Sequence, residues 1–344
     1  MNTLDKYKGC LIGGAVGDAL GYTVEFFREK EIFSHYGENG ITEYELRNGK
    51  AIISDDTQMT LFTANGLLLG DKDGSYIKSI YDCYKEWFVT QNCEYKIKLK
   101  YHSWLVDVPE LWKRRAPGFT CLSAISSGKM GSVRNPINDS KGCGGVMRVA
   151  PVGLFFKDIS KISQTDMISA EVSAITHGHE LGYIPSACFA HIINLVSHTD
   201  ISLKDAVKDS ISHTKKLFKN CNHIDYFCQL MNKALKLSGK NISDLDAIHE
   251  LGEGWVAEET LAIAVYCALK YENDFEKAII TSVNHNGDSD STGAVTGNIL
   301  GAYLGMNAIP EKFIENLEIK DVILEIACDL YNCTPENINS KYLK

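Results

Sequence analysis

The chain has 344 residues, of which 44% are hydrophobic and 23% are charged, so it can bury a large core. Its 44 acidic and 35 basic residues give a formal charge of -9 without a basic stripe, which argues against nucleic-acid and anionic-membrane partners. The 11 cysteines are scattered and form no Cys-x-x-Cys pair, as is typical of reduced thiols in the cytosol. No segment has the roughly 18 uninterrupted apolar residues of a membrane span. We therefore expect a cytoplasmic protein. As a separate expectation, we take it to be a monomer.

Helical periodicity runs through most of the chain. Apolar residues recur at helical spacing in 4–21, 57–69, 75–91, 118–127, 167–175, 185–198, 203–218, 224–237, 256–271, 274–284, 292–305 and 321–331. Only residues 40–53 resemble an extended hairpin, with Asn48-Gly49 as the turn. No linker divides the sequence. These patterns predict an all-α fold with at most a short β-hairpin, formed by residues 1–344 as a single compact domain.

The first helix and a late helix each carry a glycine at every fourth position. The positions are Gly9, Gly13, Gly17 and Gly21 in the first, and Gly293, Gly297, Gly301 and Gly305 in the second. A glycine inside a helix costs about 1 kcal/mol relative to alanine, so two such ridges need a reason. A ridge without side chains lets another backbone approach closely. We infer that the two helices cross at the centre of the fold, although each ridge could instead accommodate bulky neighbours.

Two acidic clusters, more than two hundred residues apart, each stand at the start of a predicted helix. They are Ser54-Asp55-Asp56-Thr57 and Asp288-Ser289-Asp290-Ser291-Thr292. Either cluster alone is explained by helix capping, because Asp and Ser are favoured at helix N-termini. Together they offer more oxygens than capping uses. If the clusters meet, they form an all-oxygen site suited to Mg²⁺ or Mn²⁺.

Two other metal sites fit the late cluster poorly. A twelve-residue calcium loop starting at Asp288 would need a glutamate where Ile299 stands. Zinc would find no cysteine in either cluster and at most one nearby imidazole, from His285.

A glycine-rich loop lies in the middle of the chain, at Gly142-Cys143-Gly144-Gly145-Val146-Met147-Arg148. Such a loop can be a simple turn, or its backbone N–H groups can approach phosphate oxygens closely. Cys143 is a poor candidate for a nucleophile because no partner base is identifiable. His177 follows in the segment THGHELGY, where a histidine is more often structural than catalytic.

Five stretches together resemble the ADP-ribosylglycohydrolase family. They are GCLIGGAVGDALGYTVEF (9–26), SDDTQMTLFTANGLL (54–68), GCGGVMRVAPVGL (142–154), THGHELGY (176–183) and GDSDSTGAVTGNILGAYLG (287–305), in the family's order. The resemblance implies a compact all-α domain with a binuclear site for two divalent cations, Mg²⁺ or Mn²⁺. It also implies removal of ADP-ribose from modified protein side chains or related small molecules.

The resemblance assigns roles to individual residues. The metal ligands it implies are Ser54, Asp55, Asp56, Asp288, Asp290 and Ser291. Asp55, Asp56 and Glu25 would be catalytic, with Glu25 lying over the metals and moving when substrate enters. The diphosphate and its ribose would bind at Gly142, Cys143, Gly144, Gly145, Val146 and Met147, and His177 would contact the adenosine side. Several relatives carry Asn in place of Cys143, which puts that hydrogen bond in doubt.

From the resemblance we expect hydrolysis of the glycosidic bond between ADP-ribose and a modified side chain. Arginine comes first because SDDTQM and GDSDSTG look closer to the arginine-directed branch. Serine-linked ADP-ribose and O-acetyl-ADP-ribose stay open as substrates. So do two other functions: a metal hydrolase that attacks a phosphoanhydride and a non-catalytic protein that binds ADP-ribose.

Overall fold

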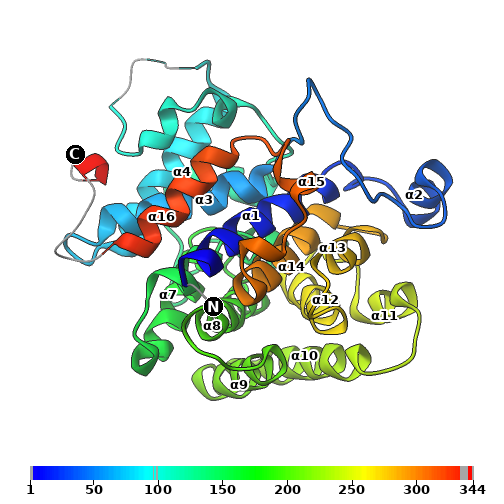
Figure 1. Ribbon diagram of the computed structural model, residues 1–344. Helices are drawn as coiled ribbons and strands as arrows, with labels where there is room; N and C mark the ends of the chain where they lie inside the picture. Colours follow the sequence, from blue (N-terminus) through cyan, green and yellow to red (C-terminus); the bar gives the residue numbers. More distant parts are fainter. Residues whose placement is uncertain (1–2, 96, 98–99, 334–339, 343–344) are drawn as a thin grey trace.

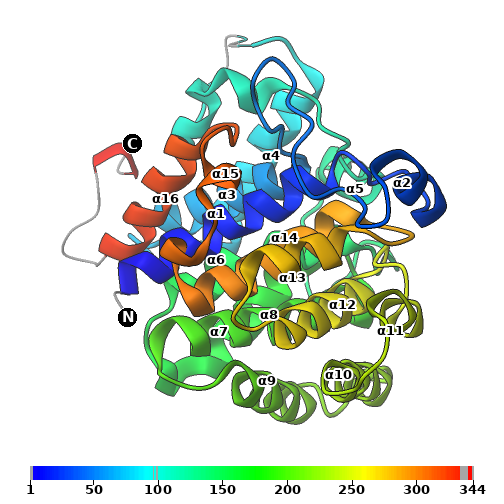
Figure 2. The ribbon, with the colours of Figure 1, turned by 45° about the vertical axis from the view of Figure 1, so that its right-hand side comes forward.

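The centre of the fold is a pair of antiparallel helices from opposite ends of the chain, α1 (Thr3–Gly21) and α14 (Ser289–Leu304) (Figures 1 and 2). This computed structural model describes residues 3–95, 97, 100–333 and 340–342. In the part of the chain that it describes there are sixteen α-helices and no β-sheet. The predicted all-α fold is therefore confirmed.

The two glycine ridges face each other along the whole α1–α14 contact, as their spacing predicted. A Cβ atom added to Gly13 would lie 2.3 Å from the carbonyl oxygen of Gly297, and one on Gly17 would lie 2.0 Å from that of Gly293. At the end of α1, a Cβ on Gly21 would lie 2.6 Å from the Cα of Asp290. The ridge thus places the second acidic cluster directly against the end of the first helix.

The remaining helices pack on both sides of this pair (Figures 1 and 2). On one side lie α3 (Asp55–Gly70), α4 (Tyr76–Asn92) and α16 (Lys320–Asn332). On the other lie α8 (Glu180–His198), α12 (Ala257–Lys270) and α13 (Phe275–Val283), next to α6 (Ala150–Phe155) and α7 (Ile162–Ala174). An outer layer holds α9 (Leu203–Leu217), α10 (Ile224–Ser238) and α11 (Asp244–Leu251). Three short helices complete the set, α2 (Glu29–Tyr36), α5 (Phe119–Ser126) and α15 (Glu311–Ile314).

The extended segment at residues 40–53 is shorter than a hairpin. Its only internal pairing is one antiparallel bridge between Arg47 and Lys50, closed by Asn48 and Gly49 at φ of 52° and 74°. The next residue, Ala51, pairs with Leu317 instead. The turn therefore lies at Asn48-Gly49 as predicted, but Ala51 pairs outside the segment.

Helix length also bears on the membrane question. Among the described helices, none is both long and apolar enough to cross a lipid bilayer.

Candidate active site

The first acidic cluster forms the N-terminus of α3. Ser54 caps the helix, because its Oγ accepts a hydrogen bond of 3.1 Å from the backbone N–H of Asp56. Ser54 is therefore a helix cap, but capping by Ser54 does not account for the carboxylates of Asp55 and Asp56. Asp55 accepts a hydrogen bond of 3.2 Å from the N–H of Gly118, and the buried Oδ1 of Asp56 has no hydrogen-bond partner among the residues that the structure describes.

The second acidic cluster forms the N-terminus of α14. Asp288 is the capping residue, and its Oδ1 accepts a hydrogen bond of 3.3 Å from the N–H of Ser291. The same N–H lies 2.9 Å from Oδ1 of Asp290, so both carboxylates point into the first turn. Asp288, Asp290 and Ser291 are all buried.

Both helix starts open into one cavity of about 370 Å³. Most of the residues proposed from sequence border it: Glu25, Asp55, Asp56, Gly142, Cys143, Gly144, Met147, His177, Asp288, Asp290 and Ser291. Ser54, Gly145 and Val146 do not, and they pack behind its wall as buried residues. The early and late clusters are therefore brought together on the floor of a ligand-sized pocket.

The cavity is strongly acidic. No lysine or arginine is found among its described lining residues. Burial, together with the charges of neighbouring carboxylates, raises the pKa of Asp55 to about 8 and holds those of Asp56 and Asp290 well above the ordinary value. Burial and the charge of Asp288 raise the pKa of Glu25 to about 9, and no described residue forms a hydrogen bond with its Oε2. Such a group of uncompensated oxygens fits divalent cations, which would supply the missing positive charge.

Asp55, Asp56, Asp288 and Asp290 all border the cavity. Among the described residues, the one set of three His, Cys, Asp or Glu ligand atoms that lie within 4.8 Å of one another is elsewhere, at Asp166, His191 and His213.

We expect the stability of the metal-free protein to fall as the pH rises from about 4 to about 8. Asp55 has a pKa of about 8 in the folded protein, whereas an unfolded aspartate has one near 3.9. Between these values the unfolded state binds fewer protons, so the free energy of unfolding decreases with pH. Mg²⁺ should therefore raise Tm more at pH 8 than at pH 5, in thermal scans with Mg²⁺ or EDTA. Equal Mg²⁺ shifts at the two pH values would contradict this expectation.

The glycine loop also borders the cavity, through Gly142, Cys143 and Gly144. Its chain pairs with the segment before α12, because the N–H of Cys143 donates to the carbonyl oxygen of Trp255 at 3.2 Å. A Cβ on Gly144 would lie 2.9 Å from Cys121 Sγ, and one on Gly145 would lie 2.0 Å from Ser173 Oγ. Packing therefore requires these glycines, and the cradle for phosphate stays a prediction.

His177 lies under this loop and is fully enclosed. Its Nδ1 is 2.8 Å from Thr176 Oγ1, which in turn accepts a hydrogen bond of 2.7 Å from Arg148. Burial and the nearby Arg148 charge lower the pKa of His177 to about 3, so its imidazole is neutral. A neutral ring at this place can exchange hydrogen bonds with a ligand but cannot supply charge.

Cys143 contacts the acidic floor of the cavity. Its thiol donates to Asp288 Oδ2 at 2.7 Å, and burial with the Asp288 charge raises the pKa of the thiol well above its usual range. The side chain is thus a protonated donor to a carboxylate, which agrees with the view that it is no nucleophile.

Asp18 is a site residue that sequence reasoning missed. It lies on α1, is fully buried, and accepts hydrogen bonds from the backbone N–H of Ser54 at 2.9 Å and from the N–H of Thr57 at 3.1 Å. The hydroxyl of Thr57 also donates to it. Asp18 therefore fixes the start of α3 and with it the direction of Asp55 and Asp56. The only signal in the sequence is a charged residue inside a glycine-rich apolar helix.

Aromatic rings form the mouth of the cavity. Phe26 and Trp255 stack with their ring centroids 6.4 Å apart, and Phe119 lies on the same rim. The exposed fractions of Phe26 and Phe119 are 71% and 84%, which is high for such large apolar side chains. Exposed rings around a pocket indicate a surface that contacts a ligand.

A comparison with protein families decides the class of this site. The model of the family described as ADP-ribosylglycohydrolase matches residues 1–339. The chain belongs to this family. Membership makes the chain an enzyme, a hydrolase of a metal-dependent family that acts on ADP-ribosylated substrates.

Two relatives differ from this chain at most sequence positions but align with it along most of their length. The chain is 23% identical to the ADP-ribosylhydrolase ARH3 of Mus musculus, over 92% of this chain and 88% of the relative. It is 24% identical to the ADP-ribosyl-[dinitrogen reductase] glycohydrolase of Rhodospirillum rubrum, over 92% and 91%. A solved ADP-ribosylglycohydrolase-related protein complex superposes with a TM-score of 0.68 at 22% identity, covering 96% of this chain and 98% of that one. This last likeness shows the shared fold.

Proposed function

We propose that the chain hydrolyses the glycosidic bond between ADP-ribose and a modified protein side chain, with arginine as the first linkage. The observation that carries the proposal is the set of buried carboxylates on the floor of the cavity, which includes the unpartnered Oδ1 of Asp56 and Oε2 of Glu25. The names of the mouse and Rhodospirillum relatives support the reaction class. The product would be free ADP-ribose.

Asp55, Asp56, Asp288, Asp290 and Ser291 would hold two divalent cations, Mg²⁺ or Mn²⁺. Ser54 would contribute through its cap on α3, because its Oγ faces Asp56. When bound, such cations neutralise the carboxylates, orient sugar hydroxyls and make water more acidic. The carboxylates themselves would then stay ionised at neutral pH despite their burial, because each would have a positive neighbour.

Glu25 would carry the proton in the reaction. Its pKa of about 9 keeps it protonated at neutral pH in the metal-free pocket, and positive charge at the floor would lower that pKa. A carboxyl group with a pKa near the working pH can donate to the leaving nitrogen and accept from the attacking water. Its free Oε2 is available to both partners. Water would add to the anomeric carbon, and the released side chain would leave with a proton.

The rim of the cavity favours arginine over uncharged linkages. A modified guanidinium can stack on exposed aromatic rings, and Phe26, Phe119 and Trp255 stand at the mouth of an acidic pocket. Such stacking is worth roughly 0.5–2 kcal/mol. A serine or acetyl linkage offers the rim no cation.

The linkage is tested with ADP-ribose joined to arginine, to serine and to acetate, each with Mg²⁺, Mn²⁺ or EDTA. We expect arginine to give the highest kcat/KM, with ADP-ribose as the product and no turnover in EDTA. Phe119→Ala should raise KM for the arginine substrate several-fold and leave KM for the serine substrate nearly unchanged. A higher kcat/KM for the serine substrate than for the arginine substrate, in the parent and in Phe119→Ala, would refute the arginine assignment.

Product analysis separates the remaining alternatives. AMP and ribose phosphate would indicate hydrolysis of the phosphoanhydride, and tight binding of ADP-ribose without turnover of any linkage would indicate a binding protein. We also propose that residues 1–344 act as one domain, supported by the contiguous core that includes residues from Tyr7 to Tyr342.

A further inference from the structure

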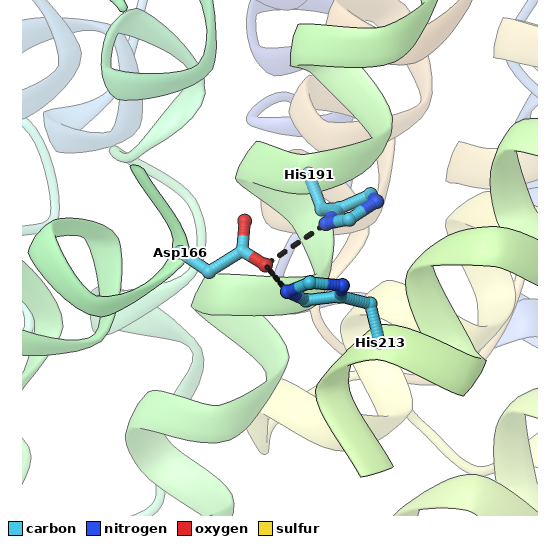
Figure 3. Close-up of side chains that lie close together, drawn as sticks. All are labelled: Asp166, His191 and His213. Atoms are coloured by element: carbon cyan, nitrogen blue, oxygen red, sulfur yellow. Dashed lines mark hydrogen bonds and ion pairs between the residues drawn. The ribbon is translucent and has the colours of Figure 1, made fainter. Parts of the chain in front are cut away.

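A second group of metal-ligating side chains lies where α7, α8 and α9 meet. Figure 3 shows Asp166 of α7, His191 of α8 and His213 of α9 pointing toward one another. One ligand atom from each lies within 4.8 Å of the other two. None of these residues borders the acidic cavity or has a role in the proposed function.

His191 is fully buried between two carboxylates. Its Nδ1 lies 2.8 Å from Asp166 Oδ2, and its Nε2 lies 2.9 Å from Asp209 Oδ1. A neutral imidazole has one N–H and can donate to only one of them. If Asp209 takes that proton, Nδ1 and Asp166 face each other as two electron-pair donors. Two such atoms repel each other at this distance unless a proton or a metal cation lies between them.

Two further observations point to a cation. Asp166 is fully buried, and in the described part of the chain its Oδ1 has no hydrogen-bond partner. His213 Nε2 lies 3.7 Å from Asp166 Oδ2 and 2.9 Å from Ser163 Oγ, so a second ring nitrogen faces the same carboxylate. A proton shared by His191 and Asp166 would leave Asp166 Oδ1 without a partner among the described residues, and it would not explain why His213 faces the same carboxylate.

We propose that Asp166, His191 and His213 bind a transition-metal ion of the Zn²⁺ class. Two imidazole nitrogens and one carboxylate are a ligand set that suits Zn²⁺ and leaves a fourth position for water or Ser163. Mg²⁺ prefers oxygen ligands and would not compete. Asp209 completes the arrangement, because a carboxylate on the other nitrogen of a ligating histidine fixes its tautomer and orientation.

The distances suit this assignment. Ligand atoms around a tetrahedral Zn²⁺ lie roughly 3.3 Å apart, and the two measured separations from Asp166 Oδ2, 2.8 and 3.7 Å, bracket that value. His213 is 28% exposed, so an ion can enter at its side and its ring can turn to close the site. The bound ion would tie three helices together at a place removed from catalysis.

The test is Zn²⁺ binding at saturating Mg²⁺, followed by competition with a chromophoric chelator and by the spectrum of Co²⁺ as a substitute. All measurements use a protein with Asp56→Asn, a change meant to weaken Zn²⁺ binding in the acidic cavity. Three double variants add His213→Gln, Asp209→Asn or, as a matched control, His35→Gln to this background. The side chain of His35 is 62% exposed on α2.

We expect one equivalent of Zn²⁺ in the Asp56→Asn protein and in the His35→Gln control, with a tetrahedral Co²⁺ spectrum. His213→Gln should weaken the affinity at least about 100-fold, and Asp209→Asn about 10-fold, as removal of a supporting carboxylate does in known sites. Circular dichroism shows whether the partly exposed variants stay folded. Equal Zn²⁺ affinity in the His213→Gln and His35→Gln proteins, or no binding at all, would overturn the proposal whatever reaction the enzyme catalyses.

Discussion

Asp56→Asn will abolish turnover while the protein stays folded. The substitution keeps the shape of the side chain but removes a buried carboxylate, whose Oδ1 has no hydrogen-bond partner among the described residues. If Asp56 holds a metal, the loss of that ligand removes several kcal/mol of transition-state stabilisation, or about 10³-fold or more in kcat. The measurement is release of ADP-ribose, with calorimetric titration of Mg²⁺ as a second readout.

A matched control separates the site from general loss of charge. Asp225→Asn changes an aspartate in the first turn of α10 that is 70% exposed and pairs with Lys215 at the surface. Exposed pairs contribute about 0–1 kcal/mol, so activity and Mg²⁺ affinity should stay as in the parent. Near-normal release of ADP-ribose by Asp56→Asn would remove this residue from the metal site.

The second large effect is on stability. Gly297→Ala should lower the free energy of unfolding by about 3 kcal/mol, because the added Cβ would lie 1.9 Å from the carbonyl oxygen of Gly13. In an ordinary helix interior the same change stabilises by about 1 kcal/mol, so the sign itself tests the close contact. Chemical denaturation gives the value.

The separation of α1 and α14 also sets the position of the second acidic cluster. We therefore expect Gly297→Ala to weaken Mg²⁺ binding as well, even though residue 297 lies two turns from Asp290. Gly239→Ala serves as the control, since a Cβ there would meet no atom nearer than 3.9 Å. A Gly297→Ala protein as stable as the parent would contradict the packing of the two ridges.

Periodic features of the sequence predicted the frame of the molecule well. The 3.6-residue spacing gave the long helices, and the fourfold glycine spacing gave the contact between α1 and α14. The helices α2, α6, α11 and α15 have eight residues or fewer, and they were missed because so short a segment gives few repeats of the period, although α5, also of eight residues, was predicted. The expected pairing between the two strands of the hairpin is absent beyond Arg47 and Lys50 for another reason. Ala51 pairs with a distant residue, Leu317, and no local pattern in the sequence predicts such a contact.

The residues that border the cavity were predictable where one segment holds several carboxylates. Asp55-Asp56 and Asp288-x-Asp290 are dense enough to stand out, and the glycine ridges explain how they meet. Asp18 was missed because a single aspartate within a helix has no partner in the sequence. The group of Asp166, His191 and His213 was missed because each residue comes from a different helix. Such constellations appear only when the packing is known.

The pairing of α1 with α14 also governs how the enzyme is made. The ribosome synthesises α1 long before α14, so the glycine face of α1 stays exposed until most of the chain has been made. Contacts between such distant segments are slow to form and expose partly folded chains to aggregation. Nascent chains that stop before residue 288 would lack Asp288, Asp290 and Ser291, which are half of the six proposed ligands. Catalytic competence would therefore arise late and in one step, when translation is nearly complete.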